Sequence, residues 1–282
     1  MADFRVAGVV GWPVAHSRSP KLHSYWLARH GIAGAYLPLP VRPGDMQAAL
    51  RGLAALGFAG CNVTVPHKEA ALALADDADA IAKRIGAANL IVVRPDGRLH
   101  ASNTDAFGFL ENLRERAPGW QAQTGPAVVL GAGGSARAVV AALCDAGCPE
   151  VRLLNRTRTR AEALAAELLA AELGGAIRVL DWDARAAALE GAALVANTTT
   201  QGMAGHPALD LDLSALPRAA VVTDLVYVPL QTPLLAAARA RGNPVADGLG
   251  MLLHQARPSF AAWFGVLPEV TAELRTMIEA TL

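Results

Sequence analysis

The chain has 282 residues, 53% of them hydrophobic, and its 25 Lys and Arg side chains balance its 25 Asp and Glu side chains. This length is sufficient for two domains of ordinary size, and the neutral balance leaves no basic surface for a nucleic-acid backbone, which excludes nucleic acid as a partner. Three cysteines without a CxxC pair, no signal peptide and no apolar stretch of about 18 residues predict a cytoplasmic protein without a disulfide framework or a membrane anchor.

The N-terminal part of the chain alternates short apolar runs with stretches of helical period. Strands are expected at 4–10, 35–39, 59–65 and 89–93, and helices at 19–30, 45–56 and 67–84. Asp76–Asp79 interrupts the last helix and is expected to be a solvated turn or a helix start rather than a metal cluster. This alternation predicts βαβ units, in which helices cover a parallel or mixed sheet.

A second alternation begins after Pro118-Gly119. It has strands at 127–130, 150–155, 177–181, 192–196 and 220–225, with helices at 134–147 and 157–171, which is typical of a doubly wound Rossmann-type sheet. From Asp247 to Leu282 the pattern is helical, split at Pro258 and Pro268, and contains no strand, so we expect this tail to return to the first domain. The predicted domains are therefore residues 1–105, completed by 248–282, and residues 106–247.

A glycine-rich turn follows the first strand of the second domain. Ala127–Leu130 leads into Gly131-Ala132-Gly133-Gly134-Ser135 and then into an Ala/Val-rich helix. This order brings backbone amides and a helix N-terminus close to the pyrophosphate of a dinucleotide. The flanking strand and helix distinguish the motif from a simple tight turn, and we predict a dinucleotide site.

The end of the next strand indicates which dinucleotide binds. NAD enzymes place a carboxylate there for the ribose 2′-hydroxyl, whereas this chain has Asn155-Arg156-Thr157-Arg158-Thr159-Arg160. Arg156 and Arg160 can hold a 2′-phosphate, and Thr157 adds a hydroxyl donor. The alternative, a solvated helix start, is disfavoured because cations there oppose the helix dipole. The predicted cofactor is NADP(H).

Three polar segments interrupt the apolar pattern of the first domain. They are His16-Ser17-Arg18-Ser19-Pro20, Asn62-Val63-Thr64-Val65-Pro66-His67-Lys68 and Ser102-Asn103-Thr104-Asp105. Ligands gather at the carboxyl ends of strands in open α/β sheets, so we expect these segments to converge on a polyhydroxylated compound. Lys68 is one of only three lysines among the 25 basic residues, and an amine, unlike a guanidinium, can release a proton near neutrality.

With these motifs in this order, the sequence resembles the shikimate dehydrogenase family over nearly its whole length. Further segments that carry the resemblance are Gly86-Ala87-Ala88-Asn89, Asn197-Thr198-Thr199-Thr200-Gln201-Gly202, Asp224-Leu225-Val226-Tyr227 and Asp247-Gly248 through Gln255. The resemblance departs at His23, which is followed by Ser24 where the family usually has Asn. The loop 204–214 matches no motif and receives no role.

The resemblance implies a reversible, NADPH-linked reduction of 3-dehydroshikimate to shikimate, a step of aromatic amino-acid biosynthesis. It implies substrate contacts by Ser17, Ser19, Asn62, Thr64, Lys68, Asn89, Asp105, Tyr227 and Gln255, with the two serines and Tyr227 at the carboxylate. The implied cofactor residues are Gly131, Ala132, Gly133, Gly134, Ser135, Asn155, Arg156, Thr157, Arg160, Thr198, Leu225, Gly248 and Met251.

Lys68 and Asp105 are the predicted catalytic residues. Hydride addition to a ketone leaves an alkoxide unless an acid lies within hydrogen-bond reach of that oxygen. Lys68 would protonate it, Asp105 would orient Lys68, and in oxidation the neutral amine would accept the alcohol's proton. The alternative for the pair is a surface salt bridge worth about 0–1 kcal/mol.

Two other functions stay open at this point. Quinate carries an extra hydroxyl at the carbon that bears the carboxylate, and the resembling quinate enzymes tend to have threonine in place of one serine, whereas this chain has Ser17 and Ser19. A non-catalytic NADP-binding module need not hold both Lys68 and Asp105. The seven histidines lack metal-ligand spacing, so no metal is predicted, and the expected partner is a small molecule, with a homodimer left open.

Overall fold

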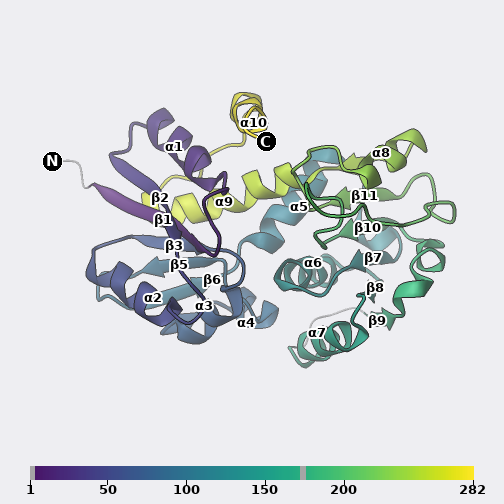
Figure 1. The fold of residues 1–282 in the computed structure, drawn as a ribbon, viewed down its shortest axis with the longest axis horizontal. Helices are drawn as coiled ribbons and strands as arrows, with labels where there is room; N and C mark the ends of the chain where they lie inside the picture. Colours follow the sequence, from purple (N-terminus) through teal and green to yellow (C-terminus); the bar gives the residue numbers. More distant parts are fainter. Residues whose placement is uncertain (1–3, 172–175) are drawn as a thin grey trace. The chain divides into compact units, whose positions relative to one another are not determined.

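The computed structural model describes residues 4–171 and 176–282. The chain divides into two compact units (Figure 1). Unit 1 extends to Thr104 and resumes over Gln255–Thr281, and unit 2 covers Asp105–His254 and Leu282. Within the described ranges, no helix is both long enough and apolar enough to cross a membrane.

Unit 1 is built on a six-stranded mixed sheet in the order β2-β1-β3-β5-β6-β4. Its strands are β1 (Arg5–Gly11), β2 (Gly34–Pro40), β3 (Gly60–Val63), β4 (Asp77–Ala78), β5 (Leu90–Val93) and β6 (Leu99–Ser102). β1 runs parallel to β2 and β3, and β5 runs antiparallel to β3 and β6. The sheet is therefore mixed, which agrees with the predicted parallel or mixed sheet.

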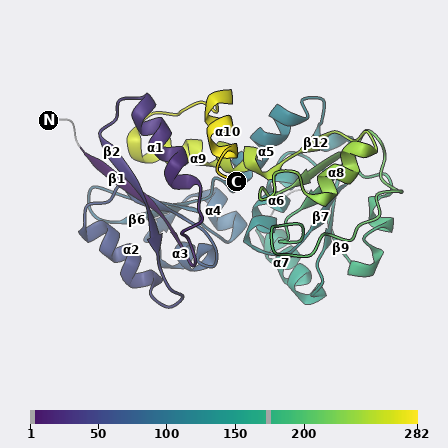
Figure 2. The ribbon, with the colours of Figure 1, turned by 45° about the horizontal axis from the view of Figure 1, so that its top comes forward.

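Helices cover both faces of this sheet, as Figures 1 and 2 show. They are α1 (Ser19–Arg29), α2 (Met46–Ala55), α3 (Lys68–Leu74), α4 (Ala80–Ile85), the second half of α9 (Gly248–Phe264) and α10 (Ala272–Glu279). α2 buries Met46, Leu50 and Leu53 against the strands. The other face holds an aromatic cluster in which His23 and Trp26 of α1 contact Phe260 of α9.

Unit 2 contains a six-stranded parallel sheet in the order β12-β11-β10-β7-β8-β9. Its strands are β7 (Ala127–Leu130), β8 (Glu150–Leu154), β9 (Ala176–Leu180), β10 (Leu194–Asn197), β11 (Val221–Asp224) and β12 (Val245–Ala246). Read from β9, this is the 3-2-1-4-5-6 order of dinucleotide-binding sheets, which bind ligands at the carboxyl ends of the strands where the order reverses. Here that place is the edge beyond β7 and β10.

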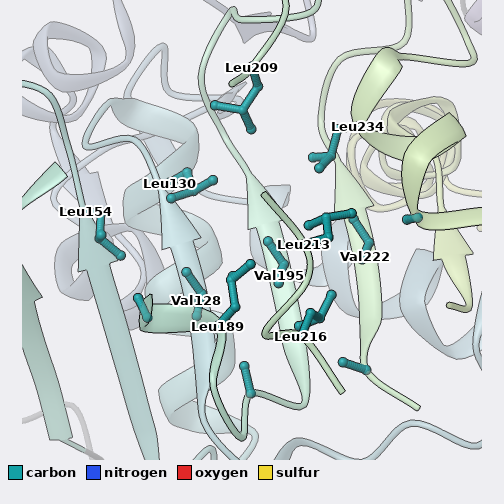
Figure 3. Close-up of a cluster of buried hydrophobic side chains, with 14 of the residues drawn as sticks. Val128, Leu130, Leu154, Leu189, Val195, Leu209, Leu213, Leu216, Val222 and Leu234 are labelled. Atoms are coloured by element: carbon teal, nitrogen blue, oxygen red, sulfur yellow. The ribbon is translucent and has the colours of Figure 1, made fainter. Parts of the chain in front are cut away.

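The helices of unit 2 are α5 (Asp105–Arg116), α6 (Gly134–Asp145), α7 (Arg158–Ala170), α8 (Pro233–Ala240) and the first half of α9, with short 3₁₀ helices at Ala122–Thr124, Trp182–Ala184 and Ala187–Leu189. α6 packs against β7 and β8, and α5 and α7 pack against α6. The opposite face carries a buried cluster in which Leu209 and Leu213 pack with Val128 and Val195 (Figure 3). The loop 204–214, which matches no motif, therefore supplies core side chains, each worth about 1.5–3 kcal/mol when fully buried.

Several elements differ from the sequence prediction. β4, β6, β12, α5 and α8 are not predicted by the patterns. β4 and β12 have only two residues each, whereas Thr232-Pro233 before α8 is an N-cap and N1 signal that the periodicity prediction does not include. Asp77 lies in β4, while Asp79 accepts a hydrogen bond from Ala82 N and starts α4. The prediction that Pro258 splits the C-terminal helix is wrong. α9 continues through it, since Ala256, Phe260 and Trp263 remain buried and outweigh the cost of about 3 kcal/mol for an interior proline.

Candidate active site

The polar segments of unit 1 meet at one edge of its sheet. β1 and β3 are parallel, so the segments that follow them lie side by side, and Thr64 N donates to Val10 O at 2.9 Å. β5 is antiparallel to β3 and pairs Leu90 with Asn62, and β6 pairs Ser102 with Leu90. The loop after β1, the Asn62–Lys68 segment, Asn89 and the Ser102–Thr104 segment therefore share this edge, as the sequence predicts.

Asn89 is the centre of a buried amide and hydroxyl network at this edge. Its Nδ2 donates to Thr104 Oγ1 at 3.0 Å and to Gln255 Oε1 at 3.3 Å, while its Oδ1 accepts from Thr104 N at 2.7 Å. All three residues are buried. Gln255 comes from α9, more than 150 residues away along the chain, so the C-terminal tail completes this part of unit 1. Asn103 beside it is used internally, since its Nδ2 donates to Ala87 O at 2.9 Å.

Asn62 is held by two residues that sequence reasoning did not find. Tyr36 Oη donates to Asn62 Oδ1 at 2.7 Å, and Asn62 Nδ2 donates to Ser259 Oγ at 2.9 Å and to Asn89 O at 3.0 Å. The orientation of the amide is thereby determined, and both of its N–H groups are used within the protein. No local motif marks Tyr36 or Ser259; their only signal is a polar group at a buried position of a strand or helix.

His23 packs behind this network. Its ring stacks on Tyr36 with centroids 4.0 Å apart and planes inclined by 3°, and in the described chain both ring nitrogens lack a hydrogen-bond partner. Complete burial lowers the pKa of His23 to about 3, so the ring is neutral. His23 therefore positions the Tyr36 ring through packing and carries no charge toward the site.

Ser17, Ser19 and Lys68 lie at helix starts on the same edge. Ser17 Oγ accepts from Ser19 N at 3.3 Å at the beginning of α1, and Ser19 is buried. Lys68 is the first residue of α3 and is half-buried, and its carbonyl accepts from Ala88 N at 2.9 Å. His67 next to it is buried and bonded to Val41 O, which gives it a structural role. Helix N-termini favour anionic ligands.

Two predicted substrate residues belong to unit 2. Asp105 is buried at the first position of α5, directly after Thr104, and Tyr227 is half-buried in the loop after β11. The structure thus gathers Ser17, Ser19, Asn62, Thr64, Lys68, Asn89 and Gln255 in unit 1. The pairing of Lys68 with Asp105 joins residues of both units and stays a prediction.

The glycine turn of unit 2 has the local geometry of a phosphate loop. Gly131 has φ +113°, and a Cβ there would overlap Thr198 Oγ1, whereas a Cβ on Gly133 would face open space. α6 starts at Gly134 with no side-chain cap and no acidic residue in its first turn, so its free amides remain available to an anion. Thr198 Oγ1 donates to Leu130 O at 2.7 Å, which places it beside this turn.

The three arginines Arg156, Arg158 and Arg160 lie next to this turn and differ in their ion pairs. β8 pairs Leu154 with Leu130, and Gly131 N donates to Leu154 O at 2.8 Å, so the Asn155–Arg160 segment follows at the same edge. Arg158 is bound by Glu162 at 2.7 Å and by Asp181 at 2.6 Å. In the part of the chain that the structure describes, the exposed side chains of Arg156 and Arg160 have no such partner. Their charges are therefore available to a phosphate, and this arrangement fits NADP.

The remaining cofactor candidates lie after β10 and β11 or at the start of α9. Leu225 N donates to Asn197 O at 2.9 Å, and Gly248 packs so closely on Leu225 O that a Cβ would overlap it. Met251 is buried on α9. Asn155 Nδ2 donates to Thr157 O at 2.8 Å and shapes the turn before α7. All these residues, with Ala132 and Ser135 of the turn, belong to unit 2.

Comparisons with known proteins agree with this geometry. Residues 9–91 match the model of the shikimate dehydrogenase substrate binding domain, and residues 114–201 match that of shikimate / quinate 5-dehydrogenase. A shikimate dehydrogenase (NADP(+)) of Paramagnetospirillum magneticum is 61% identical over 97% of this chain and 98% of its own length.

Solved structures are similar over both units. Shikimate 5-dehydrogenase of Thermus thermophilus in complex with NADP(H) and shikimate has a TM-score of 0.86 and 38% identity, over 99% of this chain and all of that one. Quinate dehydrogenase of Corynebacterium glutamicum in complex with NAD has a TM-score of 0.90 and 31% identity, over 99% of both chains.

Proposed function

The chain belongs to the shikimate dehydrogenase family, and we propose that the residues gathered above carry out its reaction. The protein is an NADP-dependent oxidoreductase that acts on a CH–OH group and interconverts 3-dehydroshikimate and shikimate. The observation that carries this function is the identity of 61% with an NADP(+) shikimate dehydrogenase over 97% of this chain, a match that extends over both units. The predicted cofactor NADP(H) is accordingly confirmed.

We propose that most substrate contacts come from residues 1–105 and 248–282 and most NADP(H) contacts from residues 106–247; Tyr227, which would contact the substrate, and Gly248 and Met251, which would contact the cofactor, are the exceptions. The Ser17 and Ser19 hydroxyls at the start of α1, with Tyr227, would bind the carboxylate. Thr64, Asn89 and Gln255 would bind ring hydroxyls. Asn62 would contribute mainly its Oδ1 lone pair, because both of its N–H groups are already donated.

We propose Lys68 as the acid and base and Asp105 as its partner. In reduction the Lys68 ammonium would donate a proton to the oxygen that becomes the alcohol, and in oxidation the neutral amine would accept it. Burial of Asp105 favours a charged or hydrogen-bonded partner for its carboxylate. NADPH, when bound, supplies the hydride.

The cofactor would be held by three features of unit 2. The first-turn amides of α6 and the turn Gly131–Gly134 would bind the pyrophosphate, and Arg156 and Arg160 would bind the 2′-phosphate. Thr198, Leu225, Gly248 and Met251 would lie along the nicotinamide half. A cytoplasmic location and the capacity to form a homodimer stay proposals. Cys61, Cys144 and Cys148 are buried and form no disulfide in the described ranges, which supports the former.

The similarity to a quinate dehydrogenase in complex with NAD makes quinate the second candidate substrate. The test is a side-by-side assay of shikimate and quinate, each with NADP and with NAD. We expect the highest kcat/KM for shikimate with NADP, because Ser17 and Ser19 are both serines and the arginines favour a phosphate. Higher kcat/KM for quinate, or for NAD, would contradict the proposal.

A further inference from the structure

Asp224 is a fully buried carboxylate at the carboxyl end of β11, and no step above uses it. It accepts three hydrogen bonds from three different segments. Asn197 Nδ2 donates to Oδ1 at 2.9 Å, Val226 N donates to Oδ1 at 3.0 Å, and Thr232 Oγ1 donates to Oδ2 at 2.7 Å. The carboxylate therefore joins the end of β10, the loop after β11 and the start of α8.

Asn197 extends this network into the turn after β10. Its Nδ2 also donates to Gln201 O at 3.1 Å, and its Oδ1 accepts from Thr199 N at 3.0 Å and from Thr199 Oγ1 at 2.7 Å. Asn197 is itself fully buried. Its side chain thus determines the shape of the Thr198–Gln201 turn, and Asp224 determines the orientation of Asn197.

The segments held in this way carry residues that we assign to ligands. Thr198 follows Asn197 directly and lies on the glycine turn through its bond to Leu130 O. Leu225 follows Asp224 and donates its N–H to Asn197 O. Tyr227 lies one residue beyond Val226, whose N–H Asp224 accepts. None of these three residues is positioned by a regular helix or strand.

A carboxylate is an unfavourable choice here for stability alone. Burial raises the pKa of Asp224 to about 6, against the lowering effect of its three hydrogen bonds, so ionisation is costly at this position. An apolar side chain in a well-packed core avoids that cost. What an apolar side chain lacks is the ability to accept bonds from three segments at once.

We propose that Asp224 is a positioning residue for the reaction, which holds the turn after β10 and the loop after β11 in fixed register so that Thr198, Leu225 and Tyr227 form a preformed surface for NADP(H) and substrate. This inference rests on the proposed roles of those three residues. Preformed supporting hydrogen bonds reduce the ordering that a ligand must impose on binding.

The test compares Asp224→Ala with Asp224→Asn. Asparagine keeps an oxygen for Asn197 and Val226, and its amide can donate to Thr232 Oγ1 once that hydroxyl turns. We expect Asp224→Ala to raise the Kd of NADPH, measured by fluorescence, by about 10–100-fold and to lower kcat/KM by a similar factor. Asp224→Asn should keep both the Kd and kcat/KM within about threefold of the parent values. Leu216→Ala, in the core cluster of the same unit, is the control for loss of stability without loss of the network.

A purely structural role has a different signature. The proposal would be overturned if Asp224→Ala lowered Tm as much as Leu216→Ala does but kept the Kd of NADPH and kcat/KM within twofold of the parent. It would also be overturned if Leu216→Ala raised the Kd of NADPH as much as Asp224→Ala does. Should Asp224→Ala fail to fold, Thr232→Val removes one donor isosterically and Thr232→Ser restores it. An unchanged Kd in Thr232→Val would then count against the proposal.

The experiment separates this inference from the proposed function. Absence of shikimate oxidation by the parent protein would contradict the proposed function, whereas NADPH affinity is measured without turnover. An active parent with an unaffected Asp224→Ala variant would reject only the positioning role.

Discussion

Arg156, Arg158 and Arg160 are alternating residues of one segment, yet their surroundings give them different roles. Asp181 and Glu162 neutralise Arg158, and the hydrogen bond and charge of Asp181 raise its pKa, whereas Arg156, before α7, and Arg160, in its first turn, have no such partners in the described part of the chain. A 2′-phosphate bound at this segment would therefore meet two available guanidinium groups and one that is already neutralised.

Replacing Arg156 and Arg160 by alanine should raise the KM for NADPH by about tenfold or more, since charge-assisted bonds to a phosphate are lost, and leave kcat nearly unchanged. The KM for NADH should change little because NADH lacks the 2′-phosphate. Arg158→Ala is the matched control and should leave the preference for NADPH intact. Steady-state kinetics with both cofactors measures this, and an unchanged KM for NADPH in the double variant would remove the assignment.

Lys68→Ala should lower kcat by about 10²–10⁴-fold, the usual contribution of a positioned proton donor. Asp105→Asn retains the shape and removes the charge, so it should also be severe. Lys83→Ala removes an exposed lysine of α4 and should behave as the parent. A loss of less than about tenfold in Lys68→Ala would leave Lys68 a binding residue only.

At the scale of whole elements, two helical glycines differ in how much space surrounds their Cα atoms. Gly250 lies in α9 against Asn112 of α5, and a Cβ there would overlap Asn112 Oδ1. Asn112 is buried and donates its Nδ2 to Asp247 O at 2.8 Å, so it cannot move away easily. A Cβ on Gly52 of α2, by contrast, would lie more than 4 Å from the surrounding atoms of the described chain.

The two glycines should respond oppositely to alanine. Gly250→Ala should lower the free energy of unfolding by about 1–3 kcal/mol through overpacking. Gly52→Ala should raise it by about 0.5–1 kcal/mol, because alanine loses less backbone entropy in a helix. Urea denaturation of both variants and the parent measures the difference; a stabilised Gly250→Ala would contradict the close packing of α9 on α5.

For the molecule as a whole, two buried groups make stability depend on pH in opposite directions. The folded-state pKa of Asp224 is raised from 3.8 to about 6, so between these values the folded state binds more protons and stability falls as pH rises. The pKa of His23 is lowered from 6.5 to about 3, so between these values the unfolded state binds more protons and stability falls as pH falls. Both groups are fully buried.

Asp224→Asn should remove the first of these dependences. From pH 4 to pH 7 the variant should gain up to about 3 kcal/mol in unfolding free energy relative to the parent, at about 1.4 kcal/mol per pH unit. His23→Phe should reduce the loss of unfolding free energy that the parent shows as the pH falls below 6. Urea titrations at several pH values in the absence of ligand test both, and parallel curves for Asp224→Asn and the parent would show that the Asp224 pKa is not raised.

Local patterns were sufficient for much of the fold. The alternation of apolar runs and helical stretches predicts most strands of both sheets, since periodicity is a property of neighbouring residues. The glycine turn after β7 and the arginine segment after β8 are likewise contiguous, so their chemistry can be recognised without a fold. Short strands such as β4 and β12 and the continuation of α9 through Pro258 are decided by pairing and burial, which no local pattern contains.

The sequence by itself determined which residue types are present in each polar segment, the order of the two sheets along the chain and the preference for a phosphate over a hydroxyl after β8. Only the tertiary structure decided that Tyr36 and Ser259 hold Asn62, that Gln255 bonds to Asn89, that Asp181 pairs with Arg158 and that Asp224 joins the end of β10, the loop after β11 and the start of α8. The physical reason is that hydrogen bonds and ion pairs depend on distance in space. Apart from Val226, which is two residues from Asp224, these partners are between 8 and nearly 200 residues apart along the chain.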